Sequence, residues 1–230
     1  MSARASRRRL AVLAGMIGLA LALSGCGDAP IEPEPTPVTG AGDLVTEDRT
    51  AGEIDRISVG AAVIVVMRAG TKTSVAITGE PNVVPLVVTE TRDGQLIVNV
   101  PKPGYITQQP VTVTVVAPAI TSVALSAGAK GSLELVADSL KADLSGGAGL
   151  AGVGRVERLS LVASSDGRVD FTSLVAGAAD VSLSGGAAAT LTVDGALTGE
   201  ASGGATVTLT QQPASVAVDA TTGGSVQGPG

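Results

Sequence analysis

The sequence predicts an all-β protein in which a small N-terminal sheet leads into a parallel β-helix of about five to six coils. Three observations support this prediction. A Ser-Gly-Gly-like motif recurs at nearly constant spacing in the second half of the chain. Short segments of alternating apolar and polar residues flank each copy, as expected for β-strands. No segment after about Ile54 has the apolar period and caps of an amphipathic helix. A fixed period of this size is typical of solenoids.

The composition limits both the core and the chemistry. The 230 residues allow one or two domains, and they include 31 glycines, one Tyr, one Phe and no Trp. We therefore expect a core of small aliphatic side chains. The chain has no His, so it lacks the commonest general base and metal ligand, and a Ser-His-Asp triad is impossible. We expect no enzymatic activity, no cofactor and no metal.

The charge of the chain is acidic and unevenly distributed. Four of the 15 basic residues precede Cys26, whereas none of the 21 acidic residues does. The chain from Cys26 onward therefore carries 11 basic and 21 acidic residues, a net charge of −10. Such a charge repels phosphate backbones, which argues against nucleic-acid binding.

The first 25 residues resemble a bacterial lipoprotein signal peptide. A basic segment, Arg4–Arg9, precedes an uncharged stretch of 14 residues, Leu10–Leu23. The stretch ends in Leu-Ser-Gly-Cys, which resembles the lipobox, and Cys26 is the only cysteine of the chain. This resemblance implies lipidation of Cys26 and anchoring to the cell membrane on its extracytoplasmic face. The alternative is an ordinary signal peptide that leaves a free thiol. The segment Ser6–Leu10 also resembles a twin-arginine export signal.

Residues 26–44 form the next predicted unit, a semi-extended tether rich in Pro and acidic residues. Residues 45–119 then predict a small antiparallel sheet of about five strands. One hairpin is predicted at Asp93-Gly94, because this dipeptide favours a tight turn. The expected strands are Ala62–Met67, Thr73–Thr78, Val83–Glu90, Gln95–Val100 and Val111–Val116.

Residues 120–230 carry the repeats and, with the preceding sheet, are expected to form one structural domain, 45–230. The repeated motifs begin at Ser126, Ser145, Ser164, Ser184, Ser202 and Thr222, at intervals of 19, 19, 20, 18 and 20 residues. We expect sharp turns at these motifs, because glycine tolerates positive φ and stacked turns require small side chains. The candidate turn glycines are Gly128, Gly146, Gly147, Gly167, Gly185, Gly186, Gly203, Gly204, Gly223 and Gly224.

These motifs resemble the head GIN domain of bacterial auto-transporter adhesins over about residues 54–227. The resemblance also includes the turn and strand Asp93–Val98 and the run Ala117–Ile120, whereas the motif at Ser164 lacks paired glycines. The family implies right-handed parallel β-helix coils at the surface or in the periplasm. It supplies no catalytic residues to this chain.

Two short motifs have functional interpretations that we reject. Gly147, Gly149 and Gly152 spell the dinucleotide-binding pattern GxGxxG, but the following residues alternate like a strand where the pattern requires a helix. Ser126 and Lys130 have the spacing of a Ser-Lys pair, but a Lys just after a turn is usually a solvated charge.

Carboxylate pairs are the remaining catalytic possibility, since glycosidic cleavage needs two carboxyl groups at a controlled separation. The candidates are Asp143, Asp166, Asp170, Asp180, Asp194 and Asp219. Counted from the turn motifs, only Asp180 and Asp219 nearly align, and Asp143 comes next. An envelope polysaccharide-active enzyme is therefore one alternative function, and an envelope-stress regulatory partner is another.

The sequence thus predicts a lipid-anchored, extracytoplasmic β-helix that acts as a non-enzymatic binding, adhesin-like or structural module. Expected partners are the membrane, through the anchor, and an envelope protein or polysaccharide. Residues 227–230 are too few to cover the last coil, whose unpaired backbone groups would favour end-to-end self-association.

The lipobox yields a first prediction. Cys26→Ser removes the sulfur that would carry the lipid, so the variant is expected to leave the membrane fraction or to remain an uncleaved precursor. Detergent-phase partitioning and labelled palmitate measure this directly. Palmitate incorporation that is unchanged in Cys26→Ser would contradict lipidation at this residue.

Overall fold

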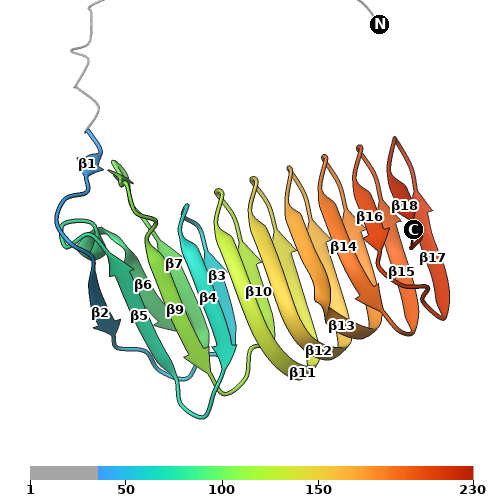
Figure 1. Cartoon of the computed structure of the whole chain (residues 1–230), viewed down its shortest axis with the longest axis horizontal. Coiled ribbons are helices and arrows are strands. Elements are labelled where there is room, and N and C mark those ends of the chain that lie inside the picture. Colours follow the sequence, from blue (N-terminus) through green and yellow to red (C-terminus); the bar gives the residue numbers. More distant parts are fainter. Residues whose placement is uncertain (1–35, 230) are drawn as a thin grey trace, which may run out of the picture. The chain divides into compact units, whose positions relative to one another are not determined.

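The computed structural model describes residues 36–229; the predicted signal peptide, Cys26 and the first part of the tether lie outside this range. The described residues form a β-solenoid of about six regular coils, with further strands at its N-terminal end (Figure 1). All-β architecture and parallel coils are therefore confirmed. The right-handed winding stays a prediction. None of the described helices has the length and hydropathy to cross a membrane.

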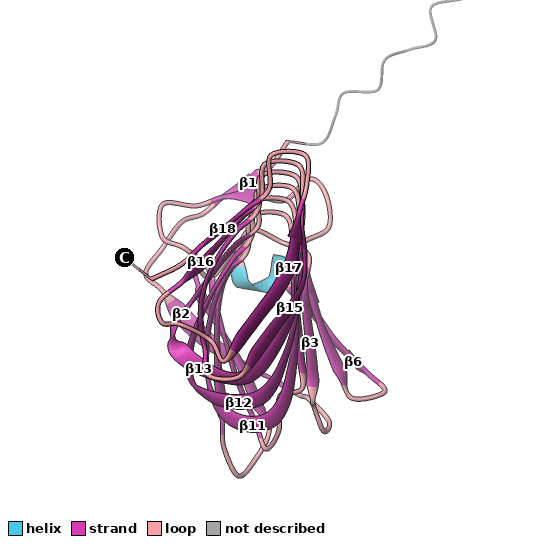
Figure 2. Ribbon diagram, turned by 90° about the vertical axis from the view of Figure 1, so that its right-hand side faces the viewer, coloured by secondary structure: helices cyan, strands magenta, loops and turns pink. Residues whose placement is uncertain are grey.

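Each regular coil contributes to two flat faces, which meet at a tight turn on one side and at a broader bend on the other (Figure 2). Three long strands pass through the bend and serve both faces: β11 (Lys130–Leu144), β12 (Gly149–Ala163) and β13 (Arg168–Leu183). The alternation of buried and exposed side chains is interrupted at the bend, where the consecutive residues Asp138 and Ser139 are both exposed. The two faces bury their inward residues against each other, which produces the continuous aliphatic core.

The first face, called the β10 face, contains the C-terminal parts of the three long strands. Its other strands are β6 (Val88–Arg92), β7 (Gln95–Asn99), β3 (Arg56–Val59), β10 (Ser122–Leu125), β15 (Ala196–Ala201) and β17 (Ser215–Ala220).

The second face, called the β4 face, contains the N-terminal parts of the long strands. Its other strands are β2 (Val45–Arg49), β5 (Ser74–Gly79), β9 (Thr112–Ala117), β4 (Ile64–Ala69), β14 (Ala188–Val193), β16 (Thr206–Leu209) and β18 (Ser225–Gln227).

The turns of the six regular coils, which join the two faces, are two-residue turns stacked in a row. In each, the fourth residue donates its N–H to the carbonyl of the first, as Ala148 does to Ser145 at 3.1 Å. Both central residues have positive φ, for example Gly146 at +57° and Gly147 at +71°, which is the type I′ geometry. Successive turns are also hydrogen-bonded, since the Gly147 N–H donates to the Ser165 carbonyl at 2.9 Å.

Two of the predicted turn glycines occupy a different position from the one expected. Gly167 and Gly224 are the fourth residues of their turns and have no positive φ. The positive φ values fall instead on Ser165, Asp166 and Thr222, so the last turn begins at Thr221, one residue before the position expected from the motif. The interval from Ser202 to Thr221 is then 19 residues, closer to the common period.

The N-terminal part differs from the predicted antiparallel sheet. Strands β2, β5 and β9 do pair antiparallel, as do β6 and β7. However, β3 pairs parallel with both β7 and β10, and β4 pairs parallel with both β9 and β11. Residues 56–69 and 95–117 therefore form two further coils of the same solenoid. Two inserted stretches, 70–94 and 100–111, interrupt the period and conceal these coils in the sequence.

Chain order and spatial order differ in these two coils. Along the β10 face the order is β7, β3, β10, so residues 56–59 lie between 95–99 and 122–125. A short 3₁₀ helix, η1 (Val84–Leu86), lies between the two faces at this end (Figure 2). Val83, Val84 and Val87 are buried around it, so the N-terminal end of the core is covered.

A buried carboxylate joins the start of the described chain to this N-terminal end. Glu80 is 4% exposed, and it accepts a hydrogen bond from the Thr107 hydroxyl. Gly40 lies directly against it, because a Cβ there would be 2.7 Å from Glu80 Oε1. Alongside, β1 (Val38–Thr39) pairs with β8 (Tyr105–Ile106). The predicted domain boundary at residue 45 therefore falls after a segment that belongs to the fold.

The two tightest glycine positions, Gly199 and Gly154, were not among the turn glycines predicted from the sequence. Gly199 has φ +127°, and a Cβ there would lie 1.9 Å from the Val181 carbonyl oxygen. Gly154 has the same arrangement against Leu135. Gly152 makes room for the only phenylalanine, since its Cβ would be 2.8 Å from Phe171 Cδ1.

These glycines allow a matched comparison. Gly204→Ala meets no atom within 4 Å but retains a positive φ, so a loss of about 1–2 kcal/mol in unfolding free energy is expected. Gly199→Ala adds a backbone clash to the same conformational strain, so we expect a loss of roughly 3 kcal/mol or more. Denaturant unfolding measures both. Equal losses would contradict the close approach of Gly199 to Val181.

Glu80 yields a pH-dependent prediction. The Thr107 hydrogen bond, followed by backbone N–H donors, lowers the pKa of Glu80 below its ordinary 4.5, against the opposing effect of burial. A carboxyl group with a lowered folded-state pKa stabilises the fold above the unfolded-state pKa. This contribution disappears as the pH falls through the folded value. We expect Glu80→Gln to lower the thermal midpoint at neutral pH and to flatten its fall below about pH 4.5. Asp138→Asn, at an exposed position, is the control; parallel pH profiles for the wild type and Glu80→Gln would contradict the role of Glu80.

Candidate functional site

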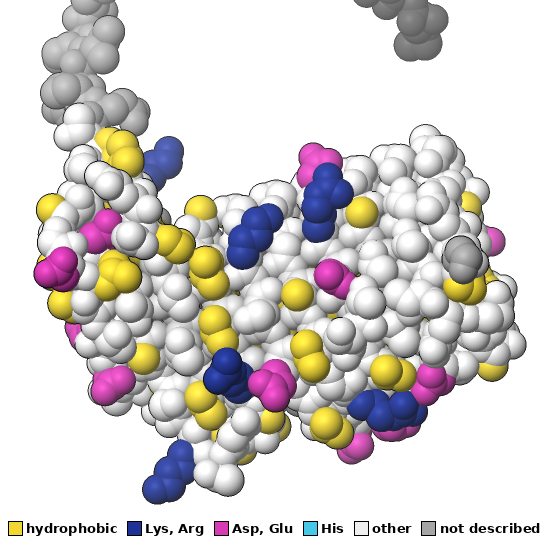
Figure 3. Space-filling model, viewed as in Figure 1, with side chains coloured by type: hydrophobic (Ala, Val, Ile, Leu, Met, Phe, Trp, Pro, Cys, Tyr) yellow, Lys and Arg dark blue, Asp and Glu magenta, His cyan; other side chains and the backbone are white. Residues whose placement is uncertain are grey.

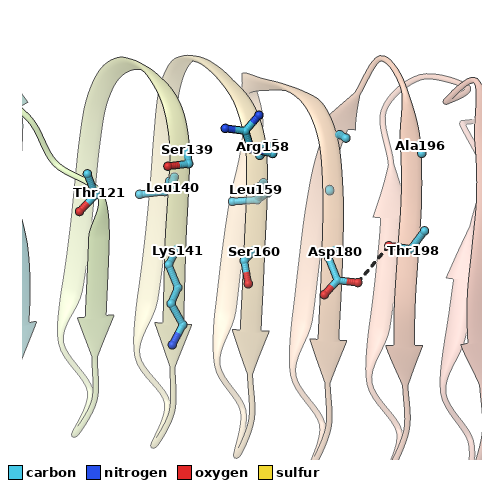
Figure 4. A pocket seen from close by; sticks show the side chains of 12 residues that line it. Thr121, Ser139, Leu140, Lys141, Arg158, Leu159, Ser160, Asp180, Ala196 and Thr198 are labelled. Carbon is cyan, nitrogen blue, oxygen red and sulfur yellow. Dashed lines mark hydrogen bonds between the residues drawn. The ribbon is translucent and has the colours of Figure 1, made fainter.

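A shallow trough crosses strands β11, β12, β13 and β15 of the β10 face beside the bend and reaches Thr121, just before β10 (Figure 4). It encloses about 390 Å³, and it runs along the solenoid axis, perpendicular to the strands. Four steps between strands correspond to about 19 Å at the usual strand spacing. The lining residues are Thr121, Ser139, Leu140, Lys141, Arg158, Leu159, Ser160, Ala178, Ala179, Asp180, Ala196 and Thr198.

The trough results from the register of the coils. Lys141, Ser160, Asp180 and Thr198 pair in sequence on neighbouring strands and form one wall. Ser139 and Arg158, paired two residues earlier, belong to the opposite wall. Leucine side chains beneath point into the core, and Leu140 and Leu159 are 1% and 3% exposed. Two alanines, Ala178 in register with Arg158 and Ala196 on the next strand, give the trough an apolar surface beside its polar groups. The small side chains Ser160, Ala178 and Ala196 leave the space open.

The polar groups of the trough differ in how far they are satisfied. The Lys141 ammonium lies 3.1 Å from Asp143 Oδ2, in an exposed ion pair. The Thr198 hydroxyl donates to Asp180 Oδ1 at 2.9 Å, which leaves the carboxylate with further acceptor capacity (Figure 4). Arg158 is exposed and has no ion-pair or hydrogen-bond partner among the residues of 36–229. The trough therefore offers a ligand the guanidinium of Arg158, which has no partner among these residues, and the carboxylate of Asp180, which can accept further hydrogen bonds.

The carboxylates proposed from the sequence are dispersed over the molecule. Asp180 and Asp219 lie on the β10 face but in different rows, because Asp180 pairs with Thr198 and Thr198 with Ala217. Asp143 is likewise in register with Val162 and Ser182, not with Asp180. Their expected near-alignment was therefore wrong by two residues. Counted back from the first residue of the next turn, Asp143 and Asp219 lie two residues before it and Asp180 lies four, because the last turn begins at Thr221, one residue earlier than its motif suggested.

The remaining carboxylates lie on other parts of the surface. Asp166 occupies a turn, and Asp170 lies on the β4 face, where the Thr172 hydroxyl and N–H lower its pKa. Asp194 lies at the bend, where Gln211 and then Arg155 lower its pKa; Arg155 reaches it at 3.0 Å. Figure 3 shows acidic and basic groups scattered over the visible face rather than gathered in one patch. Within residues 36–229, no group of three or more acidic, His or Cys side chains is arranged to hold a metal ion.

Neither the GxGxxG pattern nor the Ser126–Lys130 pair forms a functional site in the structure. Gly149 and Gly152 lie in strand β12, so no helix follows the GxGxxG pattern. The Ser126 hydroxyl donates to the Val59 carbonyl at 3.3 Å, whereas the Lys130 ammonium donates to the Gly147 carbonyl at 3.1 Å. Ser126 and Lys130 each have another partner, which argues against a catalytic pair.

Comparison with known families identifies the chain. The family described as "putative auto-transporter adhesin, head GIN domain" matches residues 53–213. The chain belongs to this family. The match begins just before β3 and ends after β16, so it includes both N-terminal coils and most of the regular ones. No curated protein matches the sequence.

Solved structures show the same fold. A putative adhesin from Bacteroides fragilis NCTC 9343 is 16% identical, with a TM-score of 0.68 over 83% of this chain and 99% of that one. A putative adhesin from Parabacteroides merdae ATCC 43184 is 17% identical, with a TM-score of 0.52 over 84% and 99%. At 16% and 17% sequence identity, the likeness to these structures shows a shared fold.

Proposed function

We propose that this head GIN protein is a lipid-anchored, extracytoplasmic binding module that presents the rigid β10 face to an envelope component. The lipobox-like Leu23–Cys26 supports the anchor and the location. The family's description as adhesins supports a binding role. The trough on a flat, hydrogen-bonded face is the observation that carries the proposal, because binding sites are typically preformed hollows with a few directed polar groups.

The non-enzymatic part of the proposal rests on the distribution of carboxylates. Hydrolysis of a glycosidic bond uses two carboxyl groups that flank the bond. Asp180 is the only carboxylate among the residues that line the trough. The trough therefore suits binding better than cleavage. Self-association through the last coil, where Val216 is 41% exposed, stays a prediction of the sequence.

The proposal predicts that the β10 face, and not the β4 face, binds an envelope component, and that the protein does not cleave what it binds. Residues 36–230, immobilised, are expected to retain an envelope component, and Ser182→Arg on the β10 face is expected to reduce the retained amount. Thr208→Arg on the β4 face is the matched control, since Ser182 and Thr208 are both half-buried strand residues. Polysaccharide fractions should keep their size distribution during incubation. Equal effects of the two variants, or no retention, would contradict the binding role; new reducing ends would favour the enzyme.

A further inference from the structure

We propose that the trough of the β10 face binds a linear polysaccharide that contains uronic acid, with the Arg158 guanidinium pairing with its carboxylates. This inference rests on the proposed binding function and assigns it a ligand class and a contact residue. It follows from the free charges of the trough, from the direction in which the trough runs, and from the backbone groups beneath it.

The charged groups of Arg158 and Asp180 favour a ligand that has both carboxylate and hydroxyl groups. The nearby acids Glu157 and Asp143 are already paired, with Arg155 at 3.3 Å and with Lys141 at 3.1 Å. Arg158 is therefore left as the cation without a partner beside the trough. A guanidinium binds carboxylates through two parallel N–H donors. The Asp180 carboxylate remains able to accept a hydroxyl proton from a sugar.

Hydroxyl side chains extend the same chemistry along the trough. Ser139 is in register with Arg158, and Ser160 with Asp180, so each charged group has a hydroxyl on the neighbouring strand. Arg158 and Asp180 occupy diagonal positions on adjacent strands, with Cα atoms about 7–8 Å apart. Donors and acceptors therefore recur from strand to strand along the axis, as a polymer of hydroxylated units requires.

A peptide fits the trough less well. Extended peptides bind by pairing their backbone with a sheet edge. Here the backbone groups beneath the trough are already paired between neighbouring coils, from β10 through β15. A lipid tail offers no polar group to the Arg158 guanidinium or the Asp180 carboxylate, so it also fits the trough less well.

The binding is expected to be salt-sensitive and driven by hydrogen bonds. Sugar rings often stack on aromatic side chains, but Phe171 is 1% exposed and Tyr105 lies at the N-terminal end, away from the trough. Charge-assisted hydrogen bonds at an exposed site are screened by salt, so affinity should fall as ionic strength rises. Several contacts along one polymer chain would compensate for the weakness of each.

Titration calorimetry with the full-length protein in detergent tests the proposal, with polygalacturonate as the probe and dextran as the neutral control. We expect binding of polygalacturonate, little binding of dextran, and a roughly tenfold weakening by Arg158→Gln. Arg168→Gln is the matched control, because Arg168 is an exposed arginine of the β4 face with no ion-pair or hydrogen-bond partner within 36–229. It makes the same change in net charge and should leave affinity unchanged.

A second pair of variants tests the place of binding independently of charge. Ser160→Tyr fills the trough and should abolish binding, whereas Thr208→Tyr on the β4 face should not. Absence of polygalacturonate binding, equal effects of the two arginine variants, or unchanged binding by Ser160→Tyr would each overturn the proposal. Polyglutamate bound as tightly as polygalacturonate would show general charge attraction and overturn it too. The capture experiment on envelope fractions can still succeed in these cases. A failure of the uronic-acid ligand is therefore distinguishable from a failure of the proposed binding function.

Discussion

Parallel backbone pairing between successive coils is the interaction on which the rest of this structure depends. Each coil hydrogen-bonds to its neighbours through both faces and also through the turn, as between Gly147 and Ser165. Every coil must therefore supply nearly the same number of residues. Coils that deviate need a compensating irregularity, which lies at Phe171–Val175 where a long interval of 20 residues is followed by one of 18. The small core residues and the glycine turns follow from the same close stacking.

Much of this arrangement is predictable because it is periodic. A motif that occupies the same place in every coil repeats in the sequence, and inward residues alternate with outward ones on the flat faces. The turns could be located because type I′ geometry favours glycine at both central positions. Where Ser165 and Asp166 take those positions, the motif alone did not show which residues have positive φ.

The features that were not predicted depend on contacts between residues far apart in the sequence. Gly152 and Phe171 are complementary only because they lie on adjacent coils, and Gly199 is constrained only by the Val181 carbonyl beside it. The trough has the same origin. Asp180 was a candidate from the sequence, but its neighbours Ser160 and Thr198 follow from the pairing of the coils, which places residues at the same distance before each turn side by side. A row of small side chains across several coils is not visible in any one segment.

The exchanged order of the first coils has a consequence for how the solenoid can assemble. From Lys141 onward, each coil can be added to the one made just before it, at the cost of closing a short loop. The coil of residues 56–69 differs, because its second neighbour begins at Ser122, and Thr121 Oγ1 reaches Asp55 across 66 residues. Closing that long loop is the most demanding step in chain entropy, and it must precede orderly growth. This junction is therefore where we expect the nucleus of the fold, with the regular coils growing from it in one direction.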